Sequence, residues 1–301
     1  MVECIEINTG PGPAAQQIFR QTALQSLSQL PPFSPILNRV LASLTGEEVS
    51  YANLSDLIEK DTVLSGNLLN LVNSALYGRS RTINSVRHAV SLLGMSKLRN
   101  AVLGMSITRM WSRTHMPESW SMARFNLHSA ATAILSDALA QRLPVKYPEG
   151  AFVAGLLHDV GRLLIATSLS KQHEEILHLL APGNRTQLDC ELEVLGFTHA
   201  QLSAEALAVW NLPEPIQAAV RDHHDAIPAD AAGTSGGIPL SVLVNVANQY
   251  VNSTGIAIVS GIPADAADPA LIKCLRLDER RLGIAIGEYE AECAAMAQFF
   301  S

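Results

Sequence analysis

The sequence predicts an all-α protein, a multi-helix bundle with few or no strands. Apolar residues recur at three- and four-residue spacing along most of the chain, and capping residues precede many of these runs. Sustained period-two alternation, which would indicate strands, is absent. Because 48% of the 301 residues are hydrophobic and 16% are charged, we expect a sizeable core and not a disordered chain.

Helical patterns follow one another through the first half. Ser34 and Pro35 combine an N-cap with proline at the first helical position. Asp61 caps a run with one apolar face that ends at Gly78, and Pro117 begins a long amphipathic run. The helices expected in this half cover 35–44, 50–60, 62–77, 86–93, 96–110 and 117–143.

The second half continues in the same way. Residues 149–168 are predicted to form one buried helix, because the run AFVAGLLHDVGRLLIATS is apolar on nearly every face. Residues 226–238 and 260–270 are rich in small residues and contain proline, which predicts surface loops. Further helices are expected at 171–181, 186–195, 198–210, 213–224, 239–251 and 278–299.

Three regions are expected along the chain: a tail over 1–12, an N-terminal helical subdomain over 13–115 and a second helical subdomain over 116–301. We identify no membrane-spanning run of about 18 residues and no secretory signal, so a cytoplasmic protein is expected. The four cysteines lie far apart without CxxC spacing, which favours reduced thiols over disulfides or a thiolate zinc site.

Charge is unevenly distributed. The net charge of −7 argues against a general nucleic-acid binder. Residues 62–117, however, contain no acidic residue, and this basic segment either pairs with acidic residues of the same chain or forms an anion- or partner-binding surface. Its basic residues are Arg79, Arg81, Arg87, Lys97, Arg99, Arg109 and Arg113, of which the first five form the candidate surface.

A series of histidines suggests one metal site. A charged aspartate in the middle of an apolar run is costly to bury unless something pairs with it, and His158-Asp159 lies in such a run. Imidazole nitrogen and carboxylate oxygen both bind divalent cations, and bundle interiors collect ligands from several helices. Taken singly, a histidine on an apolar helix is more often a core residue than a ligand, and a C-terminal helix cap is an alternative explanation of His223-His224. The candidate ligands are His128, His158, Asp159, His199, His223 and His224.

This pattern resembles the HD superfamily of helical metal-dependent phosphohydrolases, and more narrowly the HDOD group of bacterial signalling proteins. The resemblance extends from about Leu30 to about Val251. Its motifs are LPPFSPILNRVLASL, DTVLSGNLLNLVNSALYG, INSVRHAVSLLGMSKLRN, AGLLHDVGRLLI and LGFTHAQLSAEALAVWNLPEPI, followed by the closing HH. It implies an HD-type bundle and a divalent metal, with Fe, Mn, Ni, Zn or Mg all acceptable to such a site.

The resemblance also implies roles for single residues. Arg162 stands where related HD-GYP phosphodiesterases have a phosphate-contacting lysine. Asn248 aligns with the final aspartate ligand of the HD pattern, so that ligand is lost here, and the loop after His224 lacks the Gly-Tyr-Pro signature. A neutral amide binds a divalent cation less strongly than a carboxylate does, so efficient activation of a metal-bound water is not expected.

Three functions remain open on the sequence. The first is a non-catalytic signalling module with a vestigial metal pocket, which responds to signalling proteins or a small anionic ligand. The second is a metal-dependent phosphohydrolase acting on nucleotides or cyclic dinucleotides. The third is a nucleic-acid-associated regulator that uses the basic segment; overall acidity and the lack of interleaved aromatic residues argue against it.

Overall fold

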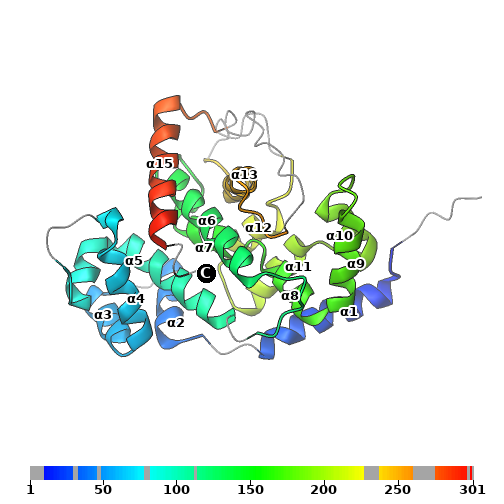
Figure 1. Cartoon of the computed structure of the whole chain (residues 1–301), viewed down its shortest axis with the longest axis horizontal. Coiled ribbons are helices and arrows are strands. Elements are labelled where there is room, and N and C mark those ends of the chain that lie inside the picture. The colour runs from blue at the N-terminus through cyan, green and yellow to red at the C-terminus, as the bar shows by residue number, and fades with distance from the viewer. Residues whose placement is uncertain are drawn as a thin grey trace, which may run out of the picture.

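In the computed structural model the chain is a set of packed helices, as the sequence predicts (Figure 1). The structure describes residues 10–29, 33–45, 49–77, 82–111, 114–226, 237–259, 275–296 and 299. Within these ranges there is no strand, only an isolated bridge between Val145 and Ile238. The helices are α1 (Pro13–Ser26), α2 (Pro35–Ala42), α3 (Tyr51–Glu59), α4 (Thr62–Val72), α5 (Val86–Trp111), α6 (Met122–Ala140), α7 (Ala151–Leu157), α8 (Val160–Ser168), α9 (Ser170–Leu180), α10 (Gln187–Leu195), α11 (His199–Val209), α12 (Glu214–Arg221), α13 (Leu240–Ser253) and α15 (Glu279–Met296).

Helices α2–α5 form one group, at the left of Figure 1. The predicted caps are present: the Ser34 side chain accepts a hydrogen bond from the Leu37 amide, and Asp61 accepts from two amides at the start of α4. Helix α5 covers two expected helices in one element. They are separated at Gly94, whose φ of 74° only glycine adopts at no steric cost.

Two expected boundaries are corrected. Helix α4 ends at Val72, before Gly78, because the Asn73 side chain bonds the carbonyl oxygens of Leu69 and Ile83 and accepts from the Ile83 amide. These bonds turn the chain at the end of α4. Gly78 itself lies outside the described residues.

Helix α6 begins at Met122, capped by Ser121, and not at Pro117, which instead opens a turn closed by the Trp120 amide. The predicted amphipathic pattern is also wrong, because α6 is the central helix and is buried on nearly every face by α7, α13 and α15.

Helix α1 packs mainly against the second half of the chain. It lies along α8, α10 and α11 (Figure 1). Its Arg20 forms an ion pair with Glu205 of α11, and the guanidinium carbon lies 4.6 Å from the ring centroid of Phe197. This contact crosses the position at which the sequence suggests a boundary between two subdomains.

One long apolar stretch of the chain lies in the interior of the protein. By length and composition, residues Pro148–Ser168 would suffice to cross a membrane, but 89% of the window is buried inside the protein. The stretch is also not the single helix that the sequence predicts, because it breaks at His158 and Asp159 between α7 and α8. Because the window is mostly buried inside the protein, packing in the core explains its apolar composition.

Several expectations fall partly or wholly outside the described residues. They are Arg79, Arg81, Arg113, Cys4, Cys274, most of the loop at 226–238 and the whole of the loop at 260–270. Of the cysteines within the described ranges, Cys190 and Cys293 are free thiols.

Candidate metal centre

The structure brings the six candidate ligands together from four parts of the chain. His128 lies in the middle of α6, and His158 and Asp159 form the break between α7 and α8. His199 is the first residue of α11, and the His223-His224 pair follows the end of α12. His224 is exposed at the edge of the cluster, whereas the side chains of the other five candidate ligands are buried.

Two glycines allow the break at Asp159 to approach the other helices. A Cβ on Gly155 would lie 2.7 Å from the Cα of Ala133 in α6, and a Cβ on Gly161 would lie 2.2 Å from the His199 carbonyl oxygen. The Gly161 amide also donates to the Ser203 hydroxyl of α11 at 2.7 Å. The spacing G-x-x-H-D-x-G therefore packs α7 onto α6 and α8 onto α11, which places Asp159 beside His199.

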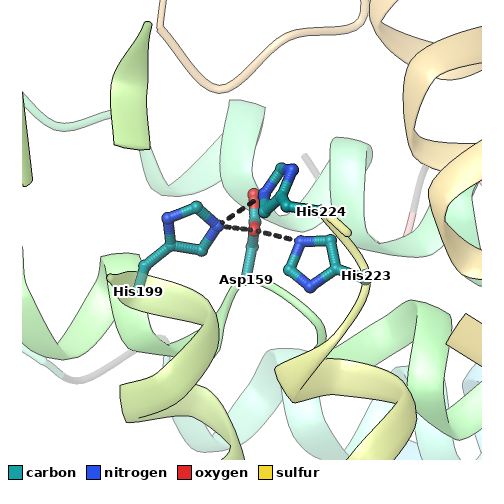
Figure 2. A group of neighbouring side chains, drawn as sticks. All are labelled: Asp159, His199, His223 and His224. Atoms are coloured by element: carbon teal, nitrogen blue, oxygen red, sulfur yellow. Dashed lines mark hydrogen bonds and ion pairs between the residues drawn. The ribbon is translucent and has the colours of Figure 1, made fainter. Parts of the chain in front are cut away.

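The two oxygens of Asp159 face two groups of histidines. Its Oδ2 lies 3.5 Å from His158 Nε2 and 3.9 Å from His128 Nε2. Its Oδ1 lies 3.0 Å from His199 Nε2 and 3.7 Å from His223 Nε2 (Figure 2). Asp159 is thus shared by two potential ligand sets, one with His128 and His158 and the other with the three later histidines.

Hydrogen bonds on the far side of each ring aim the histidines at Asp159. The Nδ1 atoms of His128, His158 and His223 lie 2.7, 2.8 and 2.6 Å from backbone carbonyl oxygens. Because a carbonyl oxygen only accepts, each Nδ1 must donate, and the Nε2 lone pair of a neutral ring is then left facing the cluster. Metal-binding histidines in proteins are oriented in this way.

His199 is held by Glu191, a residue that the sequence analysis missed. Both carboxylate oxygens of Glu191 lie 2.8 Å from His199 Nδ1, and one of them accepts from the His199 backbone amide at 2.7 Å. The side chain of Glu191 is fully buried in α10. A glutamate on the inner face of a helix, eight residues before a candidate ligand, is the signal that would have identified it.

Burial and charge set the protonation of the cluster. Burial lowers the pKa of His158 to about 3 and that of His223 to about 4, so both rings are neutral at pH 7. Burial also acts on His199, but the carboxylates of Glu191 and Asp159 outweigh it and raise the pKa of His199 to about 9. Despite burial, the neighbouring His158, His199 and Arg162 hold the pKa of Asp159 well below its usual range.

Two buried polar atoms show that the cluster fits a cation. His223 Nε2 makes no hydrogen bond, and it lies 3.7 Å from Asp159 Oδ1, which is also in contact with His199 Nε2 at 3.0 Å. Leaving a buried nitrogen without a partner is costly, and a divalent ion between His223 Nε2 and Asp159 Oδ1 would satisfy it. Imidazole nitrogens with one carboxylate form a donor set suited to iron, manganese, nickel or zinc. The residues present therefore fit a metal ion.

Arg162 and Asn248 border the first ligand set. One guanidinium nitrogen of Arg162 lies 3.2 Å from Asp159 Oδ2. Asn248, on α13, lies within hydrogen-bonding reach of His128, and its amide oxygen accepts from Asn252 at 2.9 Å. A neutral amide therefore lies next to His128.

Two basic residues of α5 form ion pairs with acidic residues on α3 or at the start of α4. Arg87 lies 2.5 Å from Asp56 and 3.5 Å from Glu59 on α3, although its side chain is 58% exposed. The Lys97 ammonium lies 6.0 Å from the ring centroid of Tyr77, and Arg109 lies 2.8 Å from Asp61. Pairing within the chain thus accounts for part of the basic segment. Arg99 is half-buried on the same helix.

Comparison with known proteins gives the family and the fold. The family model of the HDOD domain matches residues 30–226. An HDOD domain protein of unknown function from Geobacter sulfurreducens has a TM-score of 0.72 at 24% identity, over 93% of this chain and 98% of that one. A candidate phosphohydrolase from Shewanella amazonensis SB2B has a TM-score of 0.69 at 22% identity, over 93% and 98%.

Two further relatives are longer than this chain. A candidate signal-transduction protein from Marinobacter aquaeolei VT8 has a TM-score of 0.69 at 20% identity, over 95% of this chain and 66% of that one. An uncharacterized protein from Treponema pallidum is 24% identical over 203 residues, or 66% of this chain. The match spans 38% of the length of that curated relative. At these identities the structural likenesses establish the fold and do not transfer an activity.

Proposed function

This chain belongs to the HDOD domain family, and from that premise we propose that it is a cytoplasmic signal-transduction module of bacteria. In this proposal the histidine cluster holds a divalent metal for structure or sensing and does not hydrolyse phosphate esters. The observation that carries the proposal is the charge of the cluster: Asp159 is the one carboxylate among the candidate ligands, and Asn248 supplies a neutral amide beside His128.

The charge argument concerns the activation of water. A catalytic metal centre must lower the pKa of a bound water toward neutrality and hold the ion through many turnovers. Here Asp159 is shared by both ligand sets, and the cation Arg162 lies 3.2 Å from one of its oxygens. One shared carboxylate that is already paired with a guanidinium offsets little of the charge of two divalent ions. The donor set therefore favours one bound metal over a working two-metal centre.

The hydrogen bonds of the histidine cluster are suited to holding a metal ion in place. His199 Nδ1 donates to Glu191, and the carbonyl-bound Nδ1 atoms of the other buried rings leave their Nε2 atoms directed inward. A bound metal would supply a fixed positive charge that links α6, the α7–α8 break and α11. We propose that this link makes the bundle rigid and so sets the surface that partners recognise.

Phosphohydrolase activity is the second candidate function, and one observation favours it. Two ligand sets that share a bridging carboxylate are the arrangement that two-metal hydrolases use. In such an enzyme Arg162 would steady the phosphate, as the lysine does in the related HD-GYP enzymes.

Turnover measurements distinguish the two functions. The full chain is purified without chelator, its metal content is measured, and it is assayed with Mn, Fe, Mg or Ni on a generic phosphodiester and on cyclic dinucleotides. We expect bound metal and no turnover above that of the double variant His158→Ala with Asp159→Ala. Turnover that this double variant abolishes would establish the hydrolase instead.

We also propose that α5 contributes to the partner surface, through Arg87, Lys97 and Arg99. The preceding Arg79 and Arg81 belong to the same sequence pattern. An acidic partner would compete with Asp56 and Glu59 for Arg87, whose exposed ion pairs are worth about 1 kcal/mol or less. Such a partner should bind more weakly as salt rises and should lose affinity when Arg87 is replaced by alanine.

A further inference from the structure

A small pocket lies directly beside the metal centre. It is bordered by Trp120 from the turn before α6, Arg162 and one aliphatic residue of α8, His173 and two aliphatic residues of α9, Gln187 and Glu191 of α10, and Val259. Two of these residues touch the centre: Arg162 contacts Asp159, and Glu191 contacts His199. The pocket is partly open to solvent and has room inside for about one water-sized group.

Two buried nitrogen atoms of the lining lack a partner. Trp120 is 9% exposed and His173 is 6% exposed, and neither Trp120 Nε1 nor His173 Nε2 makes a hydrogen bond. Their rings meet edge to face with centroids 5.7 Å apart. The indole N–H only donates, so it requires an acceptor that no side chain of the described residues supplies. A ligand that offers an oxygen atom at this point would satisfy it.

The charges of the lining favour an oxyanion over a cation. The Arg162 guanidinium has five N–H donors, and Asp159 engages one of its terminal nitrogens. Glu191, the carboxylate of the lining, already accepts from the amide of His199, from its Nδ1 and from Gln187 Nε2, the last at 2.7 Å. The pocket lining thus has more hydrogen-bond donors than acceptors that still lack partners.

We propose that this pocket binds one oxyanion group, a phosphate or a carboxylate, through Trp120 Nε1–H, His173 and the outer face of Arg162. One oxygen of the anion occupies the inner end, and the rest lies at the open mouth. Because Arg162 contacts both this ligand and Asp159, binding here changes the charge that faces the metal. The inference rests on the regulatory function proposed above and gives the chemical class of its input ligand.

The test is a calorimetric titration of the full chain after a chelator has removed any metal and has itself been dialysed away, so that an anion can bind neither to metal nor in competition with the chelator. Sodium phosphate and sodium acetate are the probes, each against sodium chloride at constant ionic strength. We expect saturable binding of at least one of them, and the preferred one distinguishes phosphate from carboxylate. Trp120→Phe keeps the aromatic ring but removes the N–H, and should weaken this binding about tenfold.

The matched control is Trp210→Phe, because Trp210 packs against Phe33 and Trp111 and not against the pocket. It should leave the affinity unchanged. A second measurement follows the intrinsic fluorescence of the wild-type chain, whose change on adding the anion should be absent in Trp120→Phe and present in Trp210→Phe. No saturable binding of either probe, or equal binding by Trp120→Phe, would overturn the proposal and leave water as the occupant. This outcome is separate from the turnover assay, since it is measured without metal.

Discussion

Glu191 and Asp159 lie on opposite sides of the His199 ring, with Glu191 2.8 Å from Nδ1 and Asp159 3.0 Å from Nε2. The ring is thus held between an outer carboxylate and the carboxylate of the ligand cluster. This relationship fixes the orientation of His199 and increases the basicity of its inner nitrogen, which a metal would use.

Replacing Glu191 by glutamine should weaken metal binding. The amide keeps the size of the side chain but removes the charge that supports His199, and the loss of such outer partners typically costs about 10- to 100-fold in metal affinity. Titration of the chelated, dialysed protein with Mn²⁺ or Zn²⁺ measures the effect. Glu193→Gln is the control, because Glu193 lies on the same helix and pairs with Arg185 instead. Equal affinity of Glu191→Gln and the wild type would show that this carboxylate does not support the site.

Replacing Asn248 by aspartate should strengthen metal binding, because it places a carboxylate beside His128. Affinity at such sites depends on the number of charged ligands, so we expect a gain on the order of tenfold. The same titration measures it. Asn252→Asp adds the same charge one helical turn further along α13 and should give a much smaller gain. If both variants gain equally, general electrostatic attraction and not the ligand position explains the effect.

The stability of the metal-free protein should be greatest near pH 6.5. In the folded state the pKa is about 3 for His158 and about 4 for His223, below the unfolded value of about 6.5, so stability falls as pH decreases from about 6.5 toward these values. The pKa of His199 is raised to about 9, so its contribution is complete below about 6.5 and is lost as pH rises through 9.

Urea unfolding in chelator between pH 4 and pH 9 measures this dependence. In the variant His199→Gln, stability should no longer fall on the alkaline side of pH 6.5, but it should still fall on the acid side. A stability profile that is flat from pH 6.5 to pH 9 in the wild type would contradict the assigned protonation of His199.

Replacing Gly161 by alanine should damage both the fold and the site. The added Cβ would lie 2.2 Å from the His199 carbonyl oxygen, so α8 and α11 must separate. Overpacking of this kind costs about 1–3 kcal/mol, and the shift moves Asp159 away from His199. Thermal unfolding and metal titration are the measurements. Gly283→Ala on α15 is the control, because its Cβ meets open space and the change should stabilise the helix by about 0.5–1 kcal/mol. Metal affinity unaffected by Gly161→Ala would show that the site does not need this close approach.

Local chemistry accounts for what the sequence predicted correctly. Ser34 and Asp61 cap the helices that follow them, because a cap needs only side-chain and backbone atoms within three residues. Helical periodicity likewise predicted the all-α class, since one buried face per helix is a property of neighbouring residues. The same reasoning chose the six candidate ligands by residue type, and the structure places them around one point.

Tertiary packing decided what the sequence left open or predicted wrongly. Periodicity extends a helix through His158 and Asp159, but the close contacts at Gly155 and Gly161 and the hydrogen bond from His158 to Gly155 break it there. The position of Glu191 on the inner face of a helix makes it a candidate, but only the packing of α10 against the start of α11 shows that it holds His199. The sequence by itself determined the helices and the chemistry of the ligands, because these depend on residues near one another in the chain. Only the tertiary structure decided which atoms face each other, because that depends on how separate helices pack.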